Sequence, residues 1–144
     1  MWSLTVLRLA ILSILIFTCS LTAPSRGRSE SGALKREIKL KAGQTVLVKE
    51  AGLKITFERV LEDSRCPQGV TCVWAGNGKV ALKISPVRKA QSSVQLNTTL
   101  DPKEQSFLGY DIKLVRLDPY PQANAKIDPR SYVLTLLVTR KQPG

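Results

Sequence analysis

Along most of this chain, apolar residues alternate one by one with polar residues. In residues 53–58, Leu53, Ile55 and Phe57 share one parity and the residues between them are polar. Successive side chains of a β-strand point to opposite faces of the sheet, so a period of two indicates a half-buried strand. The same alternation predicts five further strands, around Ile38/Leu40, Val80/Leu82/Ile84, Val94/Leu96, Tyr110/Ile112/Leu114 and Tyr132/Leu134/Leu136/Val138.

Turn-forming residues separate these runs. They are Ala42-Gly43, Ala51-Gly52, Asn77-Gly78, Asp101-Pro102, Asp118-Pro119 and Asp128-Pro129. Asn77-Gly78 is typical of a type I′ hairpin, which needs positive φ at both central positions, and we expect it to join residues 73–75 to residues 79–84. Short strands at this spacing predict an all-β fold, a single antiparallel β-sandwich or small barrel domain over residues 34–141.

Residues 1–23 have the layout of a signal peptide. Arg8 precedes an apolar run over residues 9–19, well short of the roughly 20 residues needed to span a bilayer. Cleavage near residue 23 would leave residues 24–33, rich in Ser, Gly and Arg, as a flexible linker. Two alternatives stay open: an uncleaved anchor, and a lipoprotein processed at Cys19, for which Phe17-Thr18 is a poor lead-in. We expect a protein that is secreted or held in the periplasm or cell envelope, with membrane contact only through the signal segment or a lipid anchor.

Removal of the leader leaves Cys66 and Cys72 as the two cysteines of the mature chain. An even count fits one disulfide in an oxidising compartment. Pro67 and Gly69 are turn-forming residues that let the chain double back between the two thiols. We expect Trp74 to pack against the disulfide or to cover the edge of the core.

This segment has two interpretations, a structural staple for a long loop or a rigid, exposed recognition loop. The candidate contact residues of such a loop are Arg65, Pro67, Gln68, Gly69, Val70 and Trp74. A redox or metal pair does not fit, because the spacing is not Cys-x-x-Cys and two thiols without histidine lack two ligands for tetrahedral zinc.

Residues 63–67 read DSRCP and residues 72–76 read CVWAG. This pattern resembles a signature of small exported bacterial proteins and lipoproteins of uncharacterised function. In that group a β-rich domain follows the leader, with later segments that correspond here to residues 110–114 (YDIKL), 119–121 (PYP) and 132–134 (YVL). The resemblance spans residues 35–139. It implies export and a shared fold, and it implies no activity.

The chain contains no histidine, the usual base that activates a Ser or Cys nucleophile. Glu62 and Asp63 are adjacent, so their carboxylates point apart in extended chain, and we expect Asp63 to form an Asx-type turn or to pair with Arg65. The sequence has no phosphate-binding glycine loop and no run of alternating oxygen ligands for calcium. We therefore expect a protein that is not an enzyme and that uses no cofactor and no metal.

Lys and Arg outnumber Asp and Glu by 22 to 11, which gives a formal net charge of +11. These cations either lie on the solvent faces of strands or bind an anionic polymer. The candidate anion-binding residues are Lys35, Arg36, Lys39 and Lys41. Aromatic residues make up only 6% of the chain and do not interleave with the cations, so no nucleic-acid partner is expected.

The sequence thus favours an exported, non-catalytic binding or interaction module of the cell envelope or extracellular space. Its partner would be an envelope polyanion or another protein. Two alternatives are a protease inhibitor that presents the disulfide-closed loop 67–71, and a polyanion-binding basic surface protein.

Overall fold

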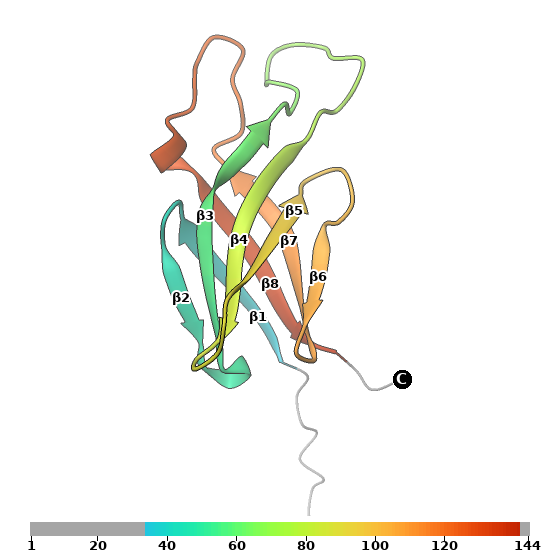
Figure 1. Cartoon of the computed structure of the whole chain (residues 1–144). Coiled ribbons are helices and arrows are strands. Elements are labelled where there is room, and N and C mark those ends of the chain that lie inside the picture. Colours follow the sequence, from blue (N-terminus) through green and yellow to red (C-terminus); the bar gives the residue numbers. More distant parts are fainter. Residues whose placement is uncertain (1–33, 142–144) are drawn as a thin grey trace, which may run out of the picture. The chain divides into compact units, whose positions relative to one another are not determined.

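The computed structural model describes residues 34–141, which form eight strands in two four-stranded antiparallel sheets (Figure 1). The sheet orders are β1-β8-β7-β6 and β2-β3-β4-β5. The strands are β1 (Lys35–Lys41), β2 (Thr45–Val48), β3 (Leu53–Asp63), β4 (Gly78–Pro86), β5 (Ser92–Asn97), β6 (Glu104–Phe107), β7 (Tyr110–Asp118) and β8 (Val133–Arg140). Two short 3-10 helices are η1 (Lys49–Ala51) and η2 (Pro129–Ser131). The expected signal segment 1–23 and linker 24–33 lie outside the described residues.

The two sheets pack face to face around one hydrophobic core. Inward-pointing side chains from both sheets form this core, such as Phe57 on β3, Leu82 on β4 and Leu136 on β8, all three of which are fully buried. Bulges in β3 and β7 change which residues face inward partway along those strands. No strand pair within residues 34–141 joins one sheet to the other by hydrogen bonds, so the fold is a sandwich rather than a closed barrel. The predicted all-β antiparallel domain is confirmed.

All six strands predicted from the alternation are present, but β2 and β6 were not predicted. Both are four-residue strands at a sheet edge. In β2 the outward-facing Leu47 is apolar, and in β6 only Phe107 is apolar. Neither segment therefore shows the alternation that marks a half-buried strand.

The hairpin expected at Asn77-Gly78 is not formed. Gly78 is the first residue of β4 and pairs with Asp63 of β3, while residues 73–75 belong to no strand. The positive φ angles of this connection belong to Gly69 (85°) and Gly76 (69°). The connection between β3 and β4 is therefore one long loop, residues 64–77.

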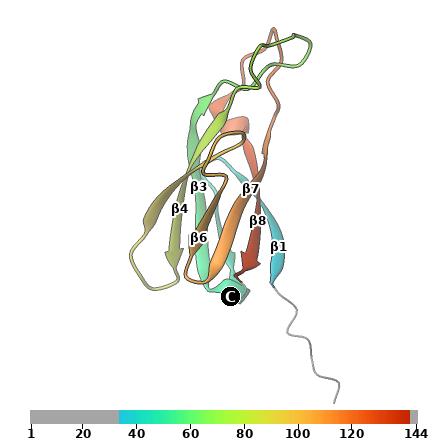
Figure 2. The same cartoon turned by 90° about the vertical axis from the view of Figure 1, so that its right-hand side faces the viewer.

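The long connections all lie at one end of the sandwich. They are residues 64–77, 98–103 and 119–132, and we call this the loop end. Figures 1 and 2 show the green loop 64–77 and the orange loop 119–132 side by side there. Residues 34–141 contain no helix that is long and apolar enough to cross a bilayer.

Candidate functional site

At the loop end, the guanidinium of Arg65 joins loop 64–77 to the chain that leaves β7. Nε donates to Oδ1 of Asp63 and Nη2 to Oδ2, each over 2.7 Å. Nη2 also donates to the carbonyl of Pro119 over 2.9 Å, and Nη1 donates to the carbonyl of Leu117. The same group lies over the ring of Tyr120, 5.0 Å from its centroid. Arg65 is only 6% exposed, so it organises the loops and is not the exposed contact residue that the sequence predicted.

Asp63 is the acidic partner of this buried pair, as the sequence predicted. Its Oδ2 also accepts a hydrogen bond from the hydroxyl of Tyr132 over 2.8 Å. Burial on its own raises the pKa of Asp63, but the Arg65 guanidinium and the Tyr132 hydroxyl stabilise the carboxylate and hold that pKa below its usual value. Burial and the neighbouring carboxylate raise the pKa of Tyr132 to about 12. At neutral pH the cluster therefore contains an ionised Asp63, a charged Arg65 and a protonated Tyr132.

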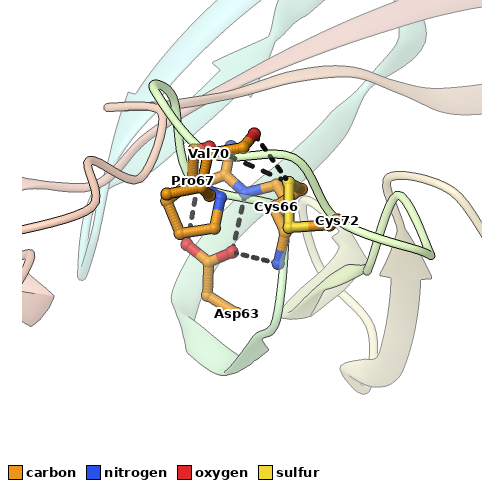
Figure 3. Close-up of a disulfide and its surroundings, with 6 residues drawn as sticks. Asp63, Cys66, Pro67, Val70 and Cys72 are labelled. Carbon is orange, nitrogen blue, oxygen red and sulfur yellow. Dashed lines mark hydrogen bonds and ion pairs between the residues drawn. A yellow bond between two sulfur atoms is a disulfide. The ribbon is translucent and has the colours of Figure 1, made fainter.

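The Cys66–Cys72 disulfide predicted from the cysteine count is present, with the two Cα atoms 5.9 Å apart (Figure 3). Below it the two legs of loop 64–77 run together, because the amide of Ser64 donates to the carbonyl of Asn77 and the amide of Cys66 to that of Ala75. The legs approach so closely that a Cβ on Gly76 would lie 1.8 Å from the carbonyl oxygen of Ser64. The loop is thus closed at its base by backbone pairing and further out by the disulfide.

A second loop is attached through Gln68. Its backbone amide donates to the carbonyl of Pro121 over 2.9 Å, and its side-chain Oε1 accepts from Nε2 of Gln122 over 2.6 Å. Gln68, predicted as a recognition residue, is therefore exposed but already bonded to loop 119–132. This link fixes the two long loops relative to each other.

The third loop is attached through the buried amide of Asn77. Nδ2 of Asn77 donates to Oδ1 of Asn97, and Oδ1 of Asn77 accepts from the backbone amides of Thr99 and Leu100. These bonds explain why Asn77 does not sit in a solvent-exposed turn. Its amide connects the base of loop 64–77 to loop 98–103.

Trp74 projects into solvent and does not pack against the disulfide or the core, which overturns that expectation. The residue is 82% exposed and its neighbour Val73 is 91% exposed. The Cys66–Ala75 backbone pairing leaves residues 73 and 74 on the outer bend of the loop, and buried Arg65 and Tyr132 already cover this edge of the core. The other large apolar residues that are exposed at or near this end are Leu61, Val70, Leu100, Val115 and Tyr120.

Two cavities flank the returning leg of loop 64–77. The larger, of about 350 Å³, is lined by Trp74, Leu100, Glu62 and Ser64 among others. The smaller, of about 250 Å³, lies against Arg65 and Tyr120, and Ala75 and Thr99 line both. Within residues 34–141 no three metal-ligating side chains converge. The loop end therefore presents an exposed indole at the rim of the larger cavity, with the smaller cavity on the other side of Ala75 and Thr99.

The four predicted anion-binding residues do not share one face. On β1, Ile38 and Leu40 point into the core, so Lys35, Lys39 and Lys41 point outward together with Glu37. Arg36 has the opposite parity and forms an ion pair with Glu50 of η1. The outer face thus carries three of the four cations with an acid among them.

Of the remaining predicted loop residues, Pro67 is half-buried, whereas Gly69 and Val70 are exposed. Sequence reasoning missed Tyr132, Asn77 and Gln122 as partners of the loop. The sequence marked Tyr132 as the first apolar residue of the last strand but gave no indication of its hydrogen bond to Asp63. Comparison with known proteins finds no family model, no curated protein and no solved structure that matches this chain.

Proposed function

We propose that this protein is an exported, non-catalytic interaction module that binds another protein of the cell envelope or extracellular space through its loop end. The observation that carries the proposal is the exposure of Trp74 on a loop held by a disulfide, by backbone pairing and by the Arg65 cluster. Soluble proteins seldom leave an indole and adjacent apolar residues in water without a partner for them.

A protein partner fits this surface on two grounds. Tryptophan is enriched among the few residues that dominate the binding energy of protein interfaces, where it fills a pocket on the partner. Because the loop is already ordered, binding would not lose the free energy that ordering a flexible loop costs. Export is supported by the signal-like leader in the sequence and by the disulfide, since disulfides persist mainly in oxidising compartments.

The inhibitor alternative is not favoured by the conformation of loop 67–71. A protease-binding loop needs an extended backbone, whereas here Gly69 has φ of 85° and Gln68 is bonded to loop 119–132.

The proposal is tested by affinity capture from washed envelopes of the native host, followed by binding measurements with the purified partner. The bait is the protein expressed from its full coding sequence, as wild type, Trp74→Ala and Leu47→Ala. Leu47 is an exposed apolar residue on the outer face of β2, away from the loop end, and serves as the matched control.

We expect one protein to be retained by the wild type and by Leu47→Ala but lost with Trp74→Ala. In surface plasmon resonance with that partner, Trp74→Ala should weaken the Kd by roughly 30-fold or more, as for a central interface residue. A partner that binds Trp74→Ala as tightly as wild type would contradict the proposal, and so would captured material that is a glycan rather than a protein.

A further inference from the structure

The basic charge of the described residues is concentrated at the end of the sandwich opposite the loop end. β1 begins there, β4 and β8 end there, and η1 and the β4–β5 turn lie there (Figure 1). We call this the basic end and define it by its basic side chains: Lys35, Arg36, Lys49, Arg88, Lys89, Arg140 and Lys141. Three acidic side chains lie among or next to them, Glu37 of β1, Glu50 of η1 and Asp111 of β7, so the basic side chains outnumber the acidic ones by seven to three.

Hydrogen bonds connect these segments into one surface. The amide of Val87 donates to the carbonyl of Gly52, which joins the β4–β5 turn to η1. The hydroxyl of Tyr110 donates to the carbonyl of Glu50, and the guanidinium of Arg140 lies over the Tyr110 ring, 5.8 Å from its centroid. The basic residues are therefore held side by side even though they are far apart in sequence.

The loop end carries less of this charge. Its basic side chains, apart from the Arg65–Asp63 pair, are Lys41, Lys79, Lys103, Lys113, Arg116, Lys126 and Arg130, and five acids lie among them: Glu62, Asp101, Glu104, Asp118 and Asp128. An anionic surface would therefore attract the basic end more strongly than the loop end, and the far end contributes little because the attraction falls off within a Debye length of about 10 Å.

Two exposed apolar side chains lie among the cations of the basic end. Val87, in the β4–β5 turn, is 45% exposed, and Leu108, in the β6–β7 turn, is 64% exposed. The turn that holds Leu108 is bonded to the last basic residue, since the amide of Lys141 donates to the carbonyl of Gly109. Cations that surround projecting apolar side chains match the interfacial region of an anionic bilayer, whereas a soluble polyanion would leave the apolar side chains in water.

We propose that the basic end docks on an anionic phospholipid bilayer, which directs Trp74 and the loop end away from the membrane. The sequence predicted membrane contact only through a leader or lipid anchor, so this contact is an addition. The proposed membrane contact does not depend on the interaction of Trp74 with a partner. Residue 34 and residue 141 both lie at the basic end.

The test compares two double charge reversals that change the net charge equally. Arg88→Glu/Lys89→Glu alters the basic end, and Lys126→Glu/Arg130→Glu alters the loop end; all four side chains are exposed. Each protein, expressed from the full coding sequence, is mixed with vesicles of 30% POPG and 70% POPC and with pure POPC vesicles. Because both variants keep the same N-terminal segment, any contribution of that segment cancels in the comparison.

A basic residue at an anionic surface improves partitioning about fivefold. We therefore expect Arg88→Glu/Lys89→Glu to lower binding to the POPG vesicles by about 30-fold or more, and Lys126→Glu/Arg130→Glu to lower it less than threefold. Binding of the wild type should fall steeply between 50 and 500 mM salt, because the Debye length shortens from about 14 Å to about 4 Å. Far-UV circular dichroism checks that both variants are folded; if either is not, Arg88→Gln/Lys89→Gln and Lys126→Gln/Arg130→Gln replace the two reversals, which keeps the change in net charge equal.

Trp74 reports the orientation, because the only other tryptophan in the sequence is Trp2, which is replaced by Phe for this measurement. Brominated lipids in the vesicles should leave Trp74 fluorescence unquenched. Equal losses in the two reversals, wild-type binding that is no stronger with POPG than with POPC, or quenching of Trp74 would each overturn the proposal. Binding to soluble heparin without binding to POPG vesicles would overturn it as well and would indicate a polymer ligand.

Discussion

Replacing Arg65 by Met removes the charged group at the centre of the loop end while keeping most of the apolar stem. The Asp63 carboxylate, whose side chain is only 9% exposed, would then keep the Tyr132 hydroxyl as its remaining side-chain donor among the described residues. Removing one partner of a buried ion pair costs about 3–5 kcal/mol, because the other charge stays buried without compensation. We expect Arg65→Met to lower the free energy of unfolding at pH 7 by about that amount.

A second arginine provides the matched control. Arg116 pairs with Asp118 at the same spacing in the sequence and the same N–O distance of 2.7 Å, but the two side chains are 60% and 39% exposed. Exposed pairs contribute about 0–1 kcal/mol, since water solvates either partner when the other is removed. Arg116→Met should therefore change the stability by less than about 1 kcal/mol.

Urea unfolding followed by circular dichroism, with the disulfide intact, measures both variants. A loss of about 3–5 kcal/mol corresponds to a fall in Tm of roughly 10–20 °C for a domain of this size. The deficit of Arg65→Met should shrink at acid pH, where protonation of Asp63 removes the uncompensated charge. The reasoning is refuted if Arg65→Met costs no more than Arg116→Met, or if its cost does not depend on pH.

Three further perturbations test the same region. Gly76→Ala should lower the free energy of unfolding by several kcal/mol, because residue 76 has φ of 69° and a Cβ there would lie 1.8 Å from a carbonyl oxygen. Gly43→Ala should lower it by only about 1–2 kcal/mol in the same urea titration, because residue 43 has a similar φ of 81° but open space around it. Because the pKa of Asp63 is lowered by folding, its contribution to stability is present above the unfolded pKa of 3.8 and is lost as pH falls through the folded pKa. Because the pKa of Tyr132 is raised by folding, its contribution is present below pH 10 and is lost as pH rises toward about 12. The difference in stability between wild type and Tyr132→Phe should therefore narrow above pH 10. Reduction of the disulfide should lower the free energy of unfolding by about 2–3 kcal/mol, and an unchanged urea midpoint would show that its seven-residue ring does not constrain the unfolded chain.

The strands were predictable because a half-buried sheet requires alternation, and most of this chain shows it. Residues 53, 55 and 57 are all buried, while Lys54 between them is exposed. The same criterion fails for β2 and β6, which pair with one neighbour each and have little of their surface in the core. Such edge strands form because they hydrogen-bond to the adjacent strand of the sheet. The pattern of residues within the edge strand itself does not reveal that partner.

The candidate site was predictable only in its local interactions. The disulfide and the Asp63–Arg65 pair join residues six and two positions apart, and both were expected from the sequence. The bonds that make Arg65 a buried residue run to Leu117 and Pro119, more than fifty positions away. Nothing near Arg65 in the sequence indicates those partners, so an arginine beside a cysteine loop was expected to be exposed.

The two errors at Asn77 and Trp74 have one physical origin. Both predictions assumed that the disulfide lies next to the core, with a hairpin immediately after it. In the structure, backbone hydrogen bonds of Ser64 with Asn77 and of Cys66 with Ala75 extend the pairing of β3 with β4 beyond the sheet. The disulfide and Trp74 are carried out past the core edge, and Asn77 is left at the base, where its amide is buried.

The chain runs up and down between the two ends of the sandwich, and this path determines which charged and apolar side chains come together at each end. Each strand places one of its ends at the loop end and the other at the basic end, so residues as distant as Lys35, Arg88 and Arg140 meet. Their clustering is not required by packing, because all three side chains are exposed. A net charge of +11 spread evenly would give no preferred orientation at an anionic surface, whereas an excess of cations at one end favours one orientation, and the proposed docking would leave the less charged loop end free for a partner.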